Sequence, residues 1–244
     1  MSRLVIAPGA AQLLDTPFMT LLRQVLDEVT PVRGLVLVDG PVGTGKTTAV
    51  RHVVPQLGIE HTYDQLDARP GSAQIVRILL RQFDSSVPER LPRDETKRRL
   101  QLRLAEKNRI VVLDEAHKLD RDAVDQIITL HDHPDANFTL VMCGARVLER
   151  LAAFEEFMSR AAIAVPFQRL SGELLLATLN RYHPLLAATD DALLNQLDAR
   201  HIHGNLRNWA HFTFLAYNRT ADLDAGIDAK TAAVCLALMP GMTS

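Results

Sequence analysis

Apolar residues in the first part of the chain follow two alternating patterns. Short uninterrupted apolar runs, the form of strands buried on both faces of a parallel sheet, occupy residues 35–38, 109–113, 138–143 and, more weakly, 162–165. Residues 61–66 form a more polar candidate strand. Between the runs, apolar residues recur every three to four positions, which predicts helices over residues 10–29, 46–56, 72–83, 93–107, 120–131 and 146–154. Pro17 marks a start or a kink in the first of these helices.

This alternation predicts an α/β fold, a parallel sheet with helices on both faces. The pattern changes after Pro166, where only helical periodicity follows, over residues 171–182, 190–199, 206–217 and 228–239. We therefore predict an α/β subdomain over residues 1–167 and a small all-helical subdomain over residues 168–244. A chain of 244 residues has room for this arrangement.

Composition narrows the class of protein without naming an activity. Apolar residues make up 47% and charged residues 23% of the chain, which argues against wholesale disorder, collagen and coiled coil. Cys143 and Cys235 are too few for a disulfide framework, and no CxxC spacing indicates zinc. The longest apolar run, residues 232–239, is too short to cross a bilayer, and the first residues make a poor secretory signal. We expect a cytoplasmic protein with no membrane contact.

Residues 40–47 carry the most specific motif of the sequence. They read GPVGTGKT, a match to G-x-x-x-x-G-K-[ST] between a predicted strand and a predicted helix. Such a loop turns its backbone N–H groups toward phosphate oxygens at the positive end of the following helix. Lys46 would neutralise the β- and γ-phosphates, and Thr47 would offer its hydroxyl to Mg²⁺. The predicted ATP-binding residues are Gly40, Pro41, Val42, Gly43, Thr44, Gly45, Lys46, Thr47 and Thr48.

A pair of acids closes the strand predicted at residues 109–113. Asp114 can complete the Mg²⁺ site with Thr47, and Glu115 can orient and deprotonate the water that attacks the γ-phosphorus. Together with the loop, the pair favours ATP hydrolysis over simple nucleotide binding. Residues 114–117 also spell the DEAH box of a helicase superfamily. Those motors need two sheet domains, and residues 168–244 are predicted to be helical, so we set this alternative aside.

The order of these motifs resembles the AAA+ ATPases. Within them it resembles the bacterial transposition-regulator group of TniB-like, MuB-like and TnsC-like ATPases (AAA_22-type), together with related secretion-type ATPases. The resemblance implies that Arg160, in the sequence Met158-Ser159-Arg160, is an arginine finger acting catalytically on the ATP of a neighbouring subunit. It also implies that Arg207, in Gly204-Asn205-Leu206-Arg207, is a second sensor that reports the γ-phosphate. An ordinary surface arginine at either position remains the alternative.

One stretch departs from the family pattern. The strand after the acidic pair usually ends near a polar residue that helps to hold the attacking water. Here the stretch reads Met142-Cys143-Gly144-Ala145-Arg146, which leaves Cys143 or Arg146 as imperfect substitutes. We therefore expect hydrolysis to be slow or to depend on a partner.

The resemblance further implies a homo-oligomer, a ring or a helical filament on double-stranded DNA, with a transposase as client. The net charge of −2 means that DNA binding needs a localised basic face. Candidate DNA contacts are Arg69, Arg77, Arg81, Arg93, Lys97, Arg98 and Arg99. The alternative is that these are solvated helix faces paired with Asp94, Glu95 and Glu106. Two further hypotheses stay open: a protein-directed ATP switch that does not bind DNA, and a scaffold that binds ATP without cleaving it.

Overall fold

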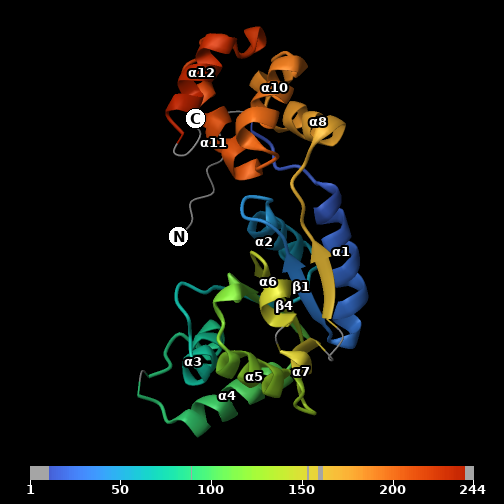
Figure 1. Cartoon of the computed structure of the whole chain (residues 1–244). Helices are drawn as coiled ribbons and strands as arrows, with labels where there is room; N and C mark the ends of the chain where they lie inside the picture. Colours follow the sequence, from blue (N-terminus) through green and yellow to red (C-terminus); the bar gives the residue numbers. More distant parts are fainter. Residues whose placement is uncertain (1–10, 89, 153, 159–161, 240–244) are drawn as a thin grey trace. The chain divides into compact units, whose positions relative to one another are not determined.

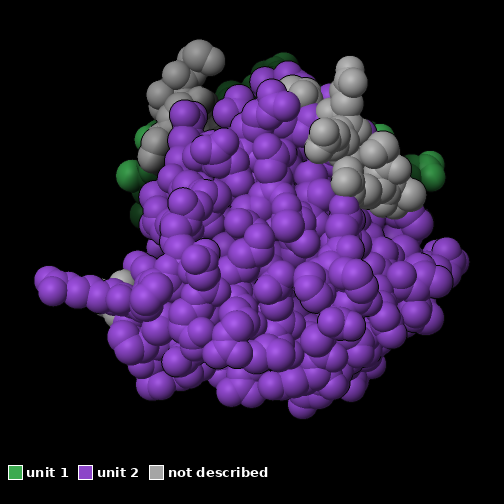
Figure 2. All heavy atoms as spheres, turned by 90° about the horizontal axis from the view of Figure 1, so that it is seen from below, with its two compact units in different colours: residues 1–16, 41–45, 168–244 green, residues 17–40, 46–167 purple. Residues whose placement is uncertain are grey.

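A computed structural model describes residues 11–88, 90–152, 154–158 and 162–239, which belong to two compact units. The first, here called the α/β unit, comprises residues 17–40 and 46–167. The second, the helical unit, comprises residues 168–244 together with residues 1–16 and 41–45. Figure 2 colours the α/β unit purple and the helical unit green.

The α/β unit is built on a parallel sheet of five strands in the spatial order β2-β3-β4-β1-β5. The strands are β1 (Leu35–Asp39), β2 (His61–Gln65), β3 (Arg109–Asp114), β4 (Phe138–Gly144) and β5 (Ala162–Pro166). The predicted α/β fold with a parallel sheet is confirmed. The polar candidate is the edge strand β2, and its polarity follows from that position, since an edge strand is only half covered.

Helices pack on both faces of the sheet because successive strand residues point to opposite sides. Val36, Val38 and Val112 face one side, where they pack with α1 (Pro17–Val29) and α2 (Lys46–Gln56). Leu37 and Leu113 face the other side. That side is covered by α3 (Ser72–Phe83), α4 (Arg93–Ala105), α5 (Arg121–His131), α6 (Val147–Ala152) and α7 (Glu155–Met158). In Figure 1, α1 runs along the sheet beside β5.

Element ends differ from the predicted ones by a few residues, each for a local reason. Helix α1 begins at Pro17, whose fixed φ suits a first helical position, and the described residues before it are not helical. A short 3₁₀ turn, Thr30–Val32, follows this helix. Arg146, predicted to begin a helix, has a φ of 54°, in the left-handed region, so α6 starts one residue later.

The helical unit contains the four predicted helices and shorter elements between them. They are α8 (Gly172–Tyr182), α9 (Pro184–Ala187), α10 (Asp191–Leu197), a π-helical turn (Asp198–Ile202), α11 (Leu206–Tyr217), a 3₁₀ turn (Leu223–Ala225) and α12 (Ala229–Ala237). Helix α9 is too short to give a periodic signal. Trp209 and Phe212 are buried edge to face in the core of this unit.

The part of the chain that the structure describes contains no helix with both the length and the apolar character needed to cross a bilayer.

Candidate nucleotide site

The carboxyl ends of the central strands bring the predicted chemical residues to one edge of the sheet. Strand β4 lies between β1 and β3, so the ends of those two strands flank the end of β4. In register, Asp114 of β3 is opposite Cys143 of β4, and Asp39 of β1 is opposite Gly144. Ligands of open parallel sheets bind outside this edge, where the strand order reverses.

Asp114 is the most deeply buried acid of the site, with 1% of its surface exposed. Its Oδ2 accepts a hydrogen bond from the Thr47 hydroxyl at 2.8 Å and a second one from the Tyr63 hydroxyl. Its Oδ1 accepts from the Glu115 backbone N–H at 2.8 Å. A buried carboxylate needs such donors to offset its lost hydration. The structure thus brings together Thr47 and Asp114, the two residues predicted to hold Mg²⁺.

Tyr63, on β2, was missing from the predicted site. Burial, followed by the hydrogen bond to Asp114, raises the pKa of the Tyr63 phenol well above its usual value, so the hydroxyl remains a donor. The Arg51 guanidinium lies 4.4 Å from the centre of its ring. The register pairs Tyr63 with Val112, two residues before Asp114. Sequence reasoning lacked that pairing, because nothing in residues 61–66 indicates which strand lies beside them.

Lys46 begins α2 and is 8% exposed. Its Nζ donates to the Gly40 carbonyl at 2.7 Å. Burial lowers the pKa of the Lys46 amine below its usual value, and the surrounding acidic groups, Asp39 and Asp114 among them, oppose that shift. Thr48 lies half-buried in the same helical turn. Gly40 has a φ of 143°, and a Cβ there would lie 2.0 Å from the Phe167 carbonyl oxygen, so only glycine fits at the start of the loop.

Residues 41–45 of the loop belong to the helical unit and contact the first turn of α11. Gly43 has a φ of 84°, and a Cβ on it would lie 2.0 Å from Oδ1 of Asn205. Asn205 caps α11 and donates from Nδ2 to the Val42 carbonyl at 3.4 Å. The backbone N–H of Arg207 donates to the Gly43 carbonyl at 3.3 Å, while the Arg207 side chain is exposed. Asn205 is therefore a loop-contacting residue to which the sequence motifs assign no role.

Glu115 directly follows β3 in a left-handed conformation, with φ 60° and ψ 30°. For a residue with a side chain, that conformation costs about 1–2 kcal/mol and is typical of functional sites. Its Oε2 lies 3.5 Å from His117 Nε2 and 4.0 Å from Lys118 Nζ, within the 3₁₀ turn Ala116–Lys118. Lys118 also donates to the Leu66 carbonyl at 2.6 Å. These neighbours restrain the carboxylate predicted to act as the base.

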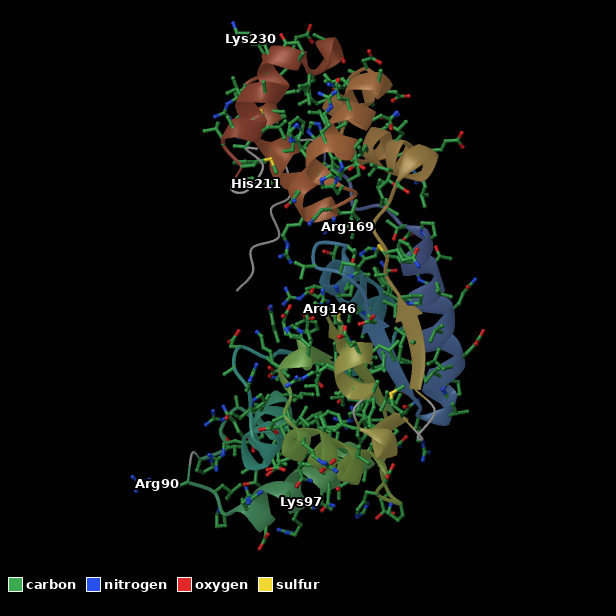
Figure 3. The ribbon with its side chains drawn as sticks, in the orientation of Figure 1. Arg90, Lys97, Arg146, Arg169, His211 and Lys230 are labelled. Carbon is green, nitrogen blue, oxygen red and sulfur yellow. The ribbon has the colours of Figure 1, made fainter. Side chains whose placement is uncertain are left out.

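Cys143 and Arg146, the two candidates for the missing polar sensor, have different surroundings. Cys143 is fully buried, and burial raises the pKa of its thiol well above the usual value, followed by the nearby Asp114 carboxylate. Arg146 lies exposed in the loop between β4 and α6 (Figure 3). Cys143 is therefore the candidate that the fold places next to Asp114. Arg160, the predicted arginine finger, lies outside the described residues.

The basic residues predicted as DNA contacts are partly engaged by the protein itself. Arg98 and Arg99 pair with Glu95 at 3.0 and 2.7 Å, and these two hydrogen bonds lower the pKa of Glu95 to about 2. Arg77 donates to the Leu91 carbonyl, and Arg93 donates to the Ser72 hydroxyl at 2.7 Å. Arg98 and Arg99 are therefore paired with an acid, as the alternative of solvated helix faces expects, and both remain exposed. Among the other candidates, Arg69 and Arg81 are exposed and Lys97 is half-buried.

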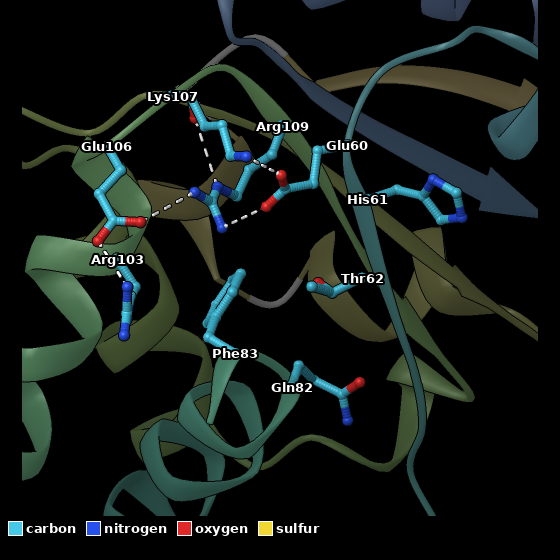
Figure 4. A pocket seen from close by; sticks show the side chains of 9 residues that line it. All are labelled: Glu60, His61, Thr62, Gln82, Phe83, Arg103, Glu106, Lys107 and Arg109. Atoms are coloured by element: carbon cyan, nitrogen blue, oxygen red, sulfur yellow. Dashed lines mark hydrogen bonds and ion pairs between the residues drawn. The ribbon is translucent and has the colours of Figure 1, made fainter. Parts of the chain in front are cut away.

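A hollow of about 330 Å³ lies at the opposite, amino-terminal ends of β2 and β3 (Figure 4). Arg109, 1% exposed, lies there between Glu60, 3.1 Å away, and Glu106, 3.8 Å away, with its guanidinium 4.6 Å from the Phe83 ring centre. Arg109 and Asp114 are the first and last residues of the six-residue strand β3, so this hollow is distinct from the candidate nucleotide site.

Comparison with known proteins agrees with this geometry. The family model described as "AAA domain" (AAA_22) matches residues 31–152, half of the chain. Among functionally curated proteins, no significant match was found.

Several solved structures are similar to this chain in fold. A Walker-type ATPase of Pyrococcus abyssi is 15% identical with a TM-score of 0.64, over 95% of this chain and 74% of that one. The RuvB Holliday junction branch migration motor of Thermotoga maritima is 16% identical with a TM-score of 0.63, over 90% and 68%. A chain from Drosophila ORC bound to DNA is 15% identical with a TM-score of 0.62, over 95% and 70%.

The family match covers the loop, the acidic pair and the strands that position them. The chain therefore belongs to the AAA domain family and is an AAA-type ATPase.

Proposed function

We propose that this ATPase binds and hydrolyses Mg-ATP at the carboxyl ends of β1, β3 and β4. We further propose that it assembles head to tail on double-stranded DNA and regulates DNA transposition by selecting a target and recruiting a transposase. The observation that carries the catalytic part is the hydrogen bond between Thr47 and Asp114, 2.8 Å long. It joins the first turn after the phosphate loop to the end of β3.

The residues present suit a magnesium ion. Mg²⁺ prefers hard oxygen ligands and retains several waters, and a hydroxyl beside a buried carboxylate offers that chemistry. Thr47 and Asp114 would hold the hydrated ion between them. When bound, the ion would neutralise charge on the β- and γ-phosphate oxygens.

The chain's own residues would divide the remaining work. Lys46, at the start of α2, would pair with the β- and γ-phosphate oxygens as a point charge. Glu115 would accept a proton from water as the water oxygen attacks the γ-phosphorus and the bond to the β–γ bridging oxygen breaks, releasing ADP and phosphate. To do so, its carboxylate must present an oxygen to that water, while Oε2 lies near His117 and Lys118 in the structure.

Assembly follows from the role proposed for Arg160. A finger that acts on a neighbour's ATP requires a head-to-tail contact, and such contacts generate rings or helical filaments. The DNA part of the proposal is supported by the transposition-regulator resemblance and by two structural neighbours, one a Holliday junction motor and one bound to DNA. Exposed Arg69 is the candidate phosphate contact that best fits this proposal.

DNA binding is testable by filter retention of labelled duplex DNA. We expect DNA binding to be about tenfold tighter with a non-hydrolysable ATP analogue than without nucleotide, because the proposed assembly couples nucleotide binding to DNA binding. Affinity should fall as salt rises, and Arg69→Ala should reduce the salt slope by about one counterion. Arg98→Ala is the matched control, since Glu95 already pairs with that guanidinium. Absence of retention with the analogue present would contradict the DNA part of the proposal.

A protein-directed ATP switch without DNA binding is the second candidate. It is favoured by the internal partners of Arg77, Arg93, Arg98 and Arg99, which reduce the free positive charge available to phosphates. ATP turnover that responds to a protein client and not to duplex DNA would select this candidate.

Slow hydrolysis by the isolated protein is a separate expectation, which follows from the buried thiol at the end of β4. A thiol is a weak hydrogen-bond donor and holds water poorly. In a phosphate-release assay, we expect steady-state turnover to be low alone and to rise with the proper partner. Cys143→Thr should raise the turnover of the isolated protein about tenfold, whereas Cys235→Thr should leave it unchanged. Turnover as fast without any partner as with one would count against this expectation.

A further inference from the structure

The position of Tyr63 relative to Asp114 suggests a role that no motif indicates. Tyr63 lies in the middle of edge strand β2, and its hydroxyl donates to Oδ2 of Asp114, the oxygen that also accepts from Thr47. The ring is held from the other side, where Arg51 of α2 stacks over it at 4.4 Å and reaches Gln65 Oε1 at 3.4 Å. Helix α2 and strand β2 together fix the direction of this hydroxyl.

The donors around Asp114 have different fates if the proposed metal binds. Thr47 is the hydroxyl assigned to Mg²⁺, which would take a lone pair of its oxygen, so this donor would itself belong to the metal shell. The Glu115 N–H on Oδ1 belongs to the backbone and remains in place. Tyr63 is a side-chain donor on Oδ2 that would stay outside the metal shell. A carboxylate anchored at both oxygens keeps one orientation, and such outer partners strengthen metal binding by preorganising the ligand.

We propose that Tyr63 is a positioning residue that aims the Asp114 carboxylate at the magnesium ion of the nucleotide complex. This inference rests on the proposed Mg-ATP site. It gives the edge strand β2 a part in metal affinity. The phosphate loop, in contrast, follows β1, and the acidic pair begins with the last residue of β3. Tyr63 touches neither substrate nor metal in this role and acts through Asp114.

The first test compares ADP binding with and without Mg²⁺ in the full chain. Tyr63→Phe keeps the ring under Arg51 and removes only the hydroxyl. We expect the Mg²⁺ concentration that half-maximally enhances ADP binding to rise about tenfold, the lower end of outer-partner effects. Metal-free ADP binding should stay within about twofold of wild type, because Lys46 and the loop are untouched. Tyr217→Phe, which removes a hydroxyl from α11, is the matched control and should behave as wild type.

The second readout uses no ligand. In a double-mutant cycle of urea unfolding, Tyr63→Phe should destabilise the wild-type background measurably and have a clearly smaller effect in the Asp114→Ala background. This result would show that the two side chains are coupled in the metal-free protein.

The outcomes separate this inference from the proposed function. If Mg²⁺ did not change ADP binding by the wild-type protein, both the positioning role of Tyr63 and the proposed Mg-ATP site would be overturned. If Mg²⁺ enhanced ADP binding in wild type and the half-maximal Mg²⁺ concentration were equal or lower in Tyr63→Phe, the positioning role alone would be overturned. Additive effects in the urea cycle would do the same, because they would mean that Tyr63 and Asp114 are not coupled.

Discussion

Lys46→Ala is expected to abolish ATP binding at micromolar nucleotide, with a loss of affinity of at least about 100-fold. The buried Lys46 side chain lies at the start of α2, and its Nζ donates to the carbonyl of Gly40, the first residue of the motif. Charge-assisted contacts with phosphate are the strongest hydrogen bonds available to the site. Fluorescence anisotropy of a labelled ATP analogue measures this loss directly.

The control for this variant is Lys230→Ala, which removes an exposed lysine from α12 (Figure 3). It should bind nucleotide as the wild type does. Circular dichroism and thermal unfolding should show that Lys46→Ala is folded. A folded Lys46→Ala protein that binds ATP within a few fold of wild type would mean that the nucleotide is held elsewhere.

Glu115→Gln is expected to retain ATP binding and to lose hydrolysis by about 10³-fold, the usual contribution of a general base. The amide keeps the size of the side chain and the left-handed backbone at Glu115, but it cannot accept the proton of the attacking water. Single-turnover hydrolysis, followed by chromatography of bound nucleotide, should therefore find ATP and not ADP on the protein.

Glu28→Gln, an exposed glutamate of α1, is the matched control and should hydrolyse ATP normally. If Glu115→Gln turned over as fast as wild type, the base would have to be another group. If wild type and Glu115→Gln both retained ATP indefinitely, with and without partners, the non-hydrolysing scaffold would be the better description.

The parts of this fold that were predictable from sequence are those fixed by local pattern. Continuous apolar runs predicted β1, β3 and β4 because those strands are buried on both faces. Strand β2 gave a weak signal because it lies at the edge, where polar side chains such as Tyr63 and Gln65 are tolerated. Helix α9 gave none because one turn has no period.

The residues of the candidate site likewise fall into those that a local pattern indicates and those that it does not. Lys46, Thr47, Asp114 and Glu115 could be named because each lies in a short motif attached to a strand end. Tyr63 and Asn205 could not, because their contacts with Asp114 and with the loop depend on which segments become neighbours in space.

Charge patterns were the least informative part of the sequence. Arg77 and Arg81 lie four residues apart on α3, yet the first donates to the Leu91 carbonyl and is half-buried, while the second is exposed. Helical spacing alone does not indicate which of two neighbouring cations the next segment covers.

A crystal structure of Glu115→Gln with ATP and Mg²⁺ tests the central claim most directly. The account predicts the γ-phosphate against Lys46 Nζ and the metal beside Thr47 and Asp114, with the Thr47 hydroxyl oxygen facing the ion. Nucleotide bound at any other place, or a Thr47 hydroxyl still bonded to Asp114 with no ion beside it, would contradict the account.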